Sequence, residues 1–290
     1  DDNQAGPIMS TLVFLTVIGA ALLHASWNAM IKGGADKRLS MGALVLGHLP
    51  IAFIAIAFVP IPEAASWPYI FAGIALHMGY QLFLLQSYKI GDLTQVYPIA
   101  RGSAPLIVTV VSVFFLGIAL TSLQLAAVAL IGLGILSLGL VRRADGAQNR
   151  KAAILALGTG CFIASYSLVD GLGARLAGTS LGYYSYLSIG NGLCMVVYLG
   201  VTGPSVFKDM LTKGRAAFVI GGSASFLAYA MVTWAFTQAP IALVTALREV
   251  SIVFALLIGV VFLKERLNVA KIISTILTLL GVILLRISKT

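Results

Sequence analysis

The chain has 290 residues, of which 59% are apolar and only 10% charged, and its mean hydropathy is +1.00. A soluble domain carries about 25% charged residues, so this composition excludes a water-exposed surface. The formal charge of +9 comes from short clusters of Lys and Arg between apolar runs, whereas a nucleic-acid-binding face gathers such residues in one patch with aromatics. We therefore expect a membrane protein that binds lipid and no nucleic acid.

The first apolar run begins after Met9 and includes His24, Trp27 and Asn28. A cleavable signal peptide has a basic start and a uniformly apolar core, so this run is predicted to be a retained transmembrane helix. Residues 1–8 are interpreted as an expression remnant ahead of a native Met9.

Apolar windows of about 20 residues, the length that crosses a bilayer core, continue along the chain. The breaks between them contain Pro, Gly or clustered charges, as loops do. The predicted fold is an all-α membrane protein with about ten transmembrane helices, at 10–31, 41–60, 67–88, 95–116, 123–141, 152–172, 181–202, 216–237, 241–262 and 268–286.

One sequence pattern occurs twice in the chain. Ala100-Arg101-Gly102 and the following apolar run to Phe115-Leu116-Gly117 recur about 147 residues later as Leu247-Arg248-Glu249 and Phe262-Leu263-Lys264. Because each half has an odd number of helices, the halves 9–142 and 151–288 are predicted to be inverted five-helix repeats around a central cavity. This arrangement is typical of transporters that work by alternating access.

Basic residues concentrate in the loops after odd-numbered helices, at Lys32 to Arg38, Arg142 to Lys151 and Lys264 to Lys271 among others. By the positive-inside rule, this bias predicts that both termini lie outside the cytoplasm.

The run Tyr97-Pro98-Ile99-Ala100-Arg101 before an apolar helix resembles the EamA type of the drug/metabolite transporter superfamily, as does Leu247-Arg248-Glu249 leading to Lys264-Glu265-Arg266. The resemblance covers Met9 to Ser288. It implies ten helices around a substrate cavity, no ATP-binding domain, and termini in the cytoplasm, which conflicts with the charge bias. The first half departs from the Gly-Glu-Arg turn of the family, since it reads Gly117-Ile118-Ala119.

In size and layout the chain is similar to bacterial exporters of aromatic amino acids. This likeness implies a location in the bacterial inner membrane and export of aromatic amino acids, methionine and similar small metabolites.

Arg101 and Arg248 occupy corresponding places in the two halves. A charge near the bilayer centre costs about 2.5–3.5 kcal/mol on insertion scales, so it is rarely retained without a partner or a wet cavity. Facing the cavity, the two guanidinium groups would bind a carboxylate from opposite sides. Alternatively, each reaches the interface or joins an internal ion pair. Glu249 adjoins Arg248, but neighbours on a helix point about 100° apart and do not readily pair.

Aromatic and polar side chains recur at helical spacing on several predicted spans. Rings for stacking and amide or imidazole groups for hydrogen bonds suit an amphipathic ligand. The predicted substrate-binding residues are His24, Trp27, Asn28, His77, Tyr80, Gln81, Tyr97, Arg101, Tyr166, Tyr229, Arg248 and Glu249.

Asp170 lies four residues after Tyr166 and shares its helix face. A carboxyl group removed from water binds a proton more readily, which makes Asp170 a candidate for proton coupling. The favoured alternative places Asp170 at a helix end, paired with Arg175 in water. Pro105 is the hinge candidate because proline removes a backbone donor, whereas Pro98 also fits the first turn of a helix.

No phosphate-binding GxxxxGK[ST] loop, HExxH motif or paired aspartates occur in the chain, so we expect neither an enzyme nor a bound cofactor or metal. Cys161 and Cys194 lie in apolar runs and are predicted to be small buried residues. The expected partner is a small-molecule substrate, and the expected state a monomer. The alternatives are an exporter of other metabolites or drugs, or an intramembrane enzyme acting on a lipid-linked substrate.

Overall fold

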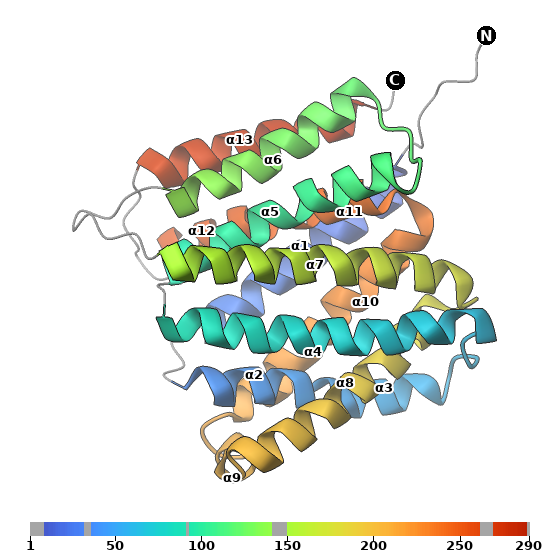
Figure 1. The fold of residues 1–290 in the computed structure, drawn as a ribbon, viewed down its shortest axis with the longest axis vertical. Coiled ribbons are helices and arrows are strands. Elements are labelled where there is room, and N and C mark those ends of the chain that lie inside the picture. Colours follow the sequence, from blue (N-terminus) through green and yellow to red (C-terminus); the bar gives the residue numbers. More distant parts are fainter. Residues whose placement is uncertain (1–8, 32–35, 91–92, 141–149, 262–268, 289–290) are drawn as a thin grey trace.

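The computed structural model describes residues 9–31, 36–90, 93–140, 150–261 and 269–288, and all regular elements in these ranges are helical (Figure 1). The predicted remnant 1–8 lies outside the described residues. The elements are α1 (Thr11–Ile31), α2 (Lys37–Leu46), α3 (His48–Ile56), η1 (Ala64–Ser66), α4 (Trp67–Ile90), α5 (Leu93–Phe114), α6 (Ser122–Leu140), α7 (Arg150–Leu176), α8 (Ser180–Thr202), α9 (Ser205–Met210), η2 (Ala217–Gly221), α10 (Gly222–Gln238), α11 (Ile241–Arg248), α12 (Ser251–Val261) and α13 (Val269–Ile287).

The described helices follow the predicted spans in order. Eight helical segments are long and apolar enough to cross a membrane, and two shorter apolar helices cover Thr11–Trp27 and Ser122–Leu138. The predicted all-α membrane fold is therefore confirmed. Helix α1 begins and α13 ends on the same side of the bundle (Figure 1).

Two predicted spans are broken into two helices each. Span 41–60 breaks at Gly47, between α2 and α3. Span 241–262 breaks between α11 and α12, where the N–H groups of Glu249 and Val250 donate to carbonyls three residues back. Irregular backbone at membrane depth is tolerated where it is buried in protein. This condition holds for α11, because all its residues are buried.

Helix α5 is continuous, although it contains both Pro98 and Pro105. Pro98 is therefore not the first residue of the helix. Proline at 105 deprives the carbonyl of Arg101, four residues earlier, of its usual intrahelical donor. The role of Pro105 as a hinge stays a prediction.

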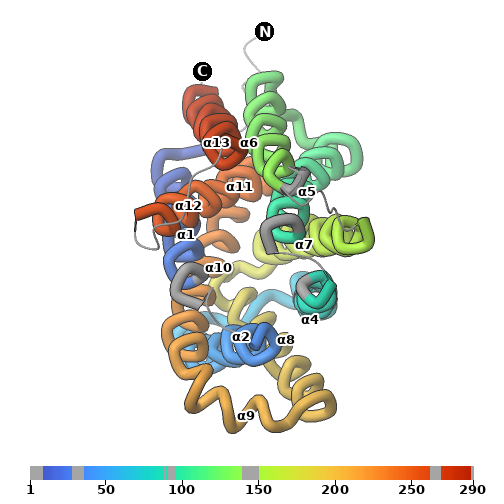
Figure 2. The backbone as a smooth tube through the Cα atoms, turned by 90° about the vertical axis from the view of Figure 1, so that its left-hand side faces the viewer, coloured from blue at the N-terminus to red at the C-terminus, as the bar shows by residue number. Residues whose placement is uncertain are grey.

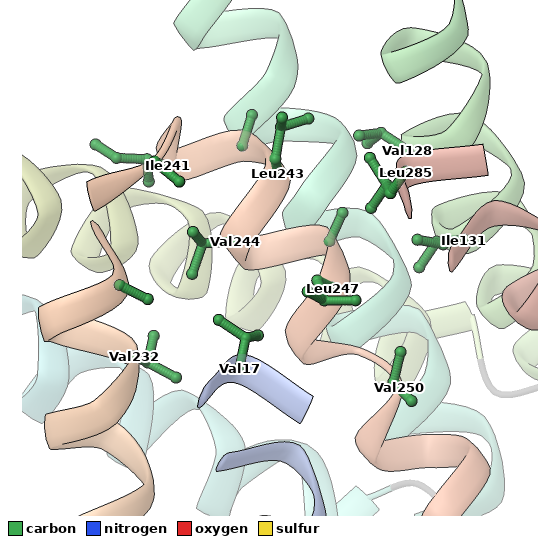
Figure 3. Packing of buried hydrophobic residues seen from close by; sticks show 14 of the residues in the cluster. Val17, Val128, Ile131, Val232, Ile241, Leu243, Val244, Leu247, Val250 and Leu285 are labelled. Carbon is green, nitrogen blue, oxygen red and sulfur yellow. The ribbon is translucent and has the colours of Figure 1, made fainter. Parts of the chain in front are cut away.

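The largest hydrophobic core surrounds α11, which packs against α1, α5, α6, α7 and α10. Figure 3 shows Leu247 of α11 between Val17 of α1 and Ile131 of α6, with Leu243 and Val244 further along the same helix. This core holds the end of α11, and thus Arg248, at the centre of the molecule.

The outer surface of the bundle is apolar. Phe58 is 83% exposed, Phe114 78% and Val201 82%, as expected where lipid tails replace protein as the apolar surroundings. Cys161 and Cys194 are exposed as well. The prediction that they are buried was wrong, because the apolar faces on which they lie point outward and not into the core.

Helices α6 and α13 pack along each other and form one end of the bundle, with α9 at the other end (Figure 2). A Cβ atom added at Gly134 would lie 2.8 Å from Leu277 Cβ, and one added at Gly281 would lie 2.7 Å from the Ala127 carbonyl oxygen. Small residues thus allow this close helix contact.

Replacing Gly47 with alanine is expected to destabilise the fold by about 1–3 kcal/mol, the usual cost of overpacking. A Cβ at Gly47 would meet the Phe218 carbonyl and lie 2.9 Å from Gly222 Cα, so backbone would have to move. Thermal unfolding in detergent measures the effect. Gly200→Ala is the matched control, because nothing lies within 4 Å of its added Cβ; equal unfolding midpoints for the two variants would contradict the prediction.

Candidate functional site

Asp170 of α7 lies fully buried in the interior and accepts hydrogen bonds from three other helices. Tyr229 of α10 donates to Oδ2 over 2.7 Å, and Tyr183 of α8 donates to Oδ1 over 3.3 Å. His77 Nε2 of α4 lies 2.8 Å from Oδ2. Because an ionised carboxylate only accepts hydrogen bonds, the histidine carries a hydrogen on Nε2 when it binds that form. Asp170 is thus a carboxylate with three donors.

Aromatic rings surround this carboxylate. The His77 ring stacks on Tyr166 at 4.2 Å between centroids and meets Tyr229 edge-on at 5.5 Å. Tyr80 and Tyr184 extend the group, at 5.6 Å from Tyr166 and 5.0 Å from Tyr229 respectively. We call His77, Tyr166, Asp170, Tyr183 and Tyr229 the Asp170 cluster. The cluster places aromatic rings, tyrosine hydroxyls and a carboxylate together in the interior.

Arg248 ends α11 beside this cluster. Its guanidinium carbon lies 5.7 Å from the centroid of the Tyr229 ring, a cation–π contact. The side chain is only 5% exposed, yet Nε and Nη2 have no hydrogen-bond partner among the described residues. A buried charge without partners is costly. Arg248 therefore has donors available for an anionic ligand.

Arg101 of α5 has a different environment. Its Nε donates to Glu249 Oε2 over 2.8 Å, and its Nη2 to Ser251 Oγ over 3.3 Å. The ion pair is buried, with side-chain exposures of 7% and 0%. It joins α5 to the break between α11 and α12. The other carboxylate oxygen, Glu249 Oε1, has no partner in the described part of the chain.

The structure brings most of the predicted site residues together. The Arg101 guanidinium lies 5.9 Å from the Tyr97 ring centroid, and His24 interacts electrostatically with both Arg101 and Arg248. Trp27 packs edge-on against His24 at 5.1 Å. Trp27 Nε1 and Gln81 Oε1 are buried without partners among the residues described. The side chain of Asn28 lies outside the described residues.

One predicted arrangement is wrong. Asp170 does not lie in water beside Arg175, because it is fully buried and bound to His77. Arg175 instead donates from Nε to the Phe236 carbonyl and from Nη2 to the Ala239 carbonyl, each at 2.8 Å. These contacts satisfy the carbonyls at the end of α10.

Sequence reasoning did not single out Tyr183, Tyr184 or Ser251 as site residues. His48 also lies buried, with its ring centroid 6.3 Å from that of Tyr184. The one available signal was the pair Tyr183-Tyr184 inside an apolar run. Tyrosine hydroxyls buried in a membrane helix need a polar partner, and here Asp170 is the partner of Tyr183.

Within the described residues, no group of three or more His, Cys, Asp or Glu side chains is placed to hold a metal ion. The buried charged side chains described are Arg101, Asp170, Arg248 and Glu249. Two carry a positive charge and two a negative one. The interior is thus electrically balanced when its histidines are neutral.

Comparisons with known proteins agree with this picture. Residues 150–287 match the model of the EamA-like transporter family. A search of curated proteins found no match. A solved crystal structure of a protein matches with a TM-score of 0.72 and 19% identity over 95% of this chain and 96% of that chain, which shows the fold alone. The match to a transporter family is consistent with a protein that is not an enzyme. Residues 150–287 thus resemble the EamA-like transporter family, which supports the drug/metabolite transporter superfamily and suggests a membrane transporter of small metabolites. The apolar helices indicate a multi-pass membrane protein.

Proposed function

We propose that the protein is a secondary transporter that exports amino acids with aromatic or similar bulky apolar side chains, methionine included, across the bacterial inner membrane. The observation that carries this proposal is Arg248, a buried guanidinium against the ring of Tyr229 whose Nε and Nη2 have no partner among the described residues. Those donors suit a substrate carboxylate. We further propose that the protein acts as a monomer.

Glu249 supplies the complementary end of the site. Its fully buried Oε1, which has no partner in the part of the chain that the structure describes, is an acceptor for a substrate ammonium group. A zwitterion adds no net charge to the balanced interior, which favours an amino acid over a simple anion or cation. The rings of the Asp170 cluster then pack against the apolar side chain.

Alternating access gives this site a route to each side of the membrane. Glu249 is fully buried here, and Arg101 and Arg248 are only 6% and 5% exposed, so the arrangement resembles a closed state of a carrier. We propose that 9–142 and 151–288 are inverted repeats that move against each other to open the site.

Flux of labelled phenylalanine, tryptophan and methionine into protein-containing liposomes tests the proposal, with empty liposomes as the control. We expect saturable, protein-dependent flux. 3-Phenylpropionate, which keeps the carboxylate, and phenethylamine, which keeps the ammonium group, should each compete more weakly than phenylalanine because both groups are bound. The absence of saturable flux from folded protein would overturn the amino-acid assignment. Product formation from a lipid-linked substrate in detergent, without flux, would instead indicate the enzyme alternative.

A further inference from the structure

We propose that His77 and Asp170 form a proton-binding site that Tyr229 links to the substrate carboxylate at Arg248. The link to substrate rests on the proposed function, whereas the proton site does not. Tyr229 is the shared residue, because its hydroxyl donates to Asp170 Oδ2 at 2.7 Å while its ring lies under the Arg248 guanidinium at 5.7 Å.

The geometry defines where the proton binds. In the proton-free state, Asp170 is an anion with three donors and His77 is neutral, with its hydrogen on Nε2. An added proton from water binds Nδ1 of His77 and gives an imidazolium paired with the carboxylate across the same 2.8 Å contact. His77 keeps 12% side-chain exposure and Asp170 none, so the proton enters through His77.

Every helix packed against Asp170 contributes to its electrostatic environment. The tyrosines are neutral donors, and Arg101 is already neutralised by Glu249. Arg248 is therefore the nearby cation whose positive charge gains a counter-charge when a substrate carboxylate binds. Outside the cluster, the titratable and charged groups nearest to it are Tyr69 and Tyr80 of α4, Tyr184 of α8 with His48 of α3 beside it, and Arg248 of α11. Next to these lie His24 of α1, Tyr97 and Arg101 of α5, and Glu249 at the end of α11.

Charge balance gives the sign of the linkage. The four buried charges sum to zero with neutral histidines. The substrate carboxylate at Arg248 lies beside Tyr229 of the Asp170 cluster, whereas the ammonium group at Glu249 lies beside Arg101, so a proton on His77 offsets the nearer, negative end of the zwitterion. Substrate carboxylate and proton therefore favour each other's binding, and by thermodynamic linkage the effect is reciprocal. Substrate and proton then cross the membrane together, so export proceeds when the outward substrate gradient exceeds the opposing proton gradient.

The proton site is tested without substrate, by acid–base titration of purified protein in detergent between about pH 5 and pH 8, where histidine titrates. Wild type should take up about one proton more than Asp170→Asn, since the imidazolium loses its anion in that variant. The matched control is Asp209→Asn, because Asp209 is exposed and pairs only with the exposed Lys213 among the described residues. Equal proton uptake by wild type and Asp170→Asn would overturn the site.

The linkage is tested by adding substrate to weakly buffered protein and recording proton uptake with a pH indicator. Uptake should accompany phenylalanine and be larger with 3-phenylpropionate, which brings no ammonium group. Tyr229→Phe removes the hydroxyl that donates to Asp170, so the number of protons taken up for each substrate molecule that this variant binds should fall. The matched control is Tyr186→Phe, whose ring packs on Trp67 at 5.3 Å, away from Asp170.

The outcomes separate the two proposals. If no amino acid is transported but the titration difference between wild type and Asp170→Asn is present, the proposed function fails and the proton site stands. If transport occurs but substrate binding releases protons or leaves them unchanged, the linkage is wrong. Flux that responds to a pH gradient in wild type and in the Asp209→Asn control but not in Asp170→Asn supports both.

Discussion

Removing either partner of the Arg101–Glu249 ion pair should lower the free energy of unfolding by about 3–5 kcal/mol, because the remaining charge stays buried and unpaired. The side chains are only 7% and 0% exposed, and the Arg101 Nε to Glu249 Oε2 distance is 2.8 Å. Glu249→Leu and Arg101→Met test the two halves of the pair. Chemical or thermal unfolding in detergent gives the measurement.

Replacing both partners together should recover most of this loss. Well-packed apolar residues of similar volume often substitute for a buried ion pair without cost, so the double variant Arg101→Met with Glu249→Leu completes a double-mutant cycle. The surface pair of Asp209 and Lys213, 41% and 75% exposed, is the control and should show a much smaller coupling. Single variants that unfold at the wild-type midpoint would show that the pair does not stabilise the fold.

This ion pair also shows what the sequence could predict of the site. The repeat identified Arg101 and Arg248 as equivalent, and helix geometry correctly ruled out a pair between Arg248 and Glu249. The partner of Glu249 lies 148 residues away, on another helix. Nothing in the local pattern distinguishes two equivalent arginines, so only the fold shows that one is paired and the other is not.

Transmembrane spans were predictable because hydropathy and length act locally along the chain. The break after Arg248 was not, because no Gly or Pro lies beside Arg248-Glu249 to mark the end of a helix in this apolar span. Asp170 illustrates the same limit. Arg175 is its nearest cation in sequence, but the His77 imidazole, 93 residues away, is the partner that the packing of α4 on α7 brings into contact.

Arg248→Lys is expected to lower transport of amino acids by about ten- to a hundredfold. The substitution keeps the charge but loses the planar fork that binds a carboxylate through two donors. One charge-assisted hydrogen bond contributes about 1.5–3 kcal/mol, and each 1.4 kcal/mol is about tenfold in affinity. Initial rates of phenylalanine flux in liposomes over a range of concentrations measure the effect. Arg248→Ala should lose more, since the charge goes as well.

The same substitution separates binding from folding. Arg286 also lies over an aromatic ring, 5.4 Å from the Phe14 centroid, but near the end of α13. Arg286→Lys is therefore the matched control and should transport normally. Because Arg248 Nε and Nη2 have no partner among the described residues, Arg248→Ala should unfold at or above the wild-type midpoint, unlike the variants of Arg101. If Arg248 is needed for flux but does not stabilise the empty protein, its role is to bind the substrate. If its removal lowers stability and leaves flux normal, Arg248 is a structural residue instead.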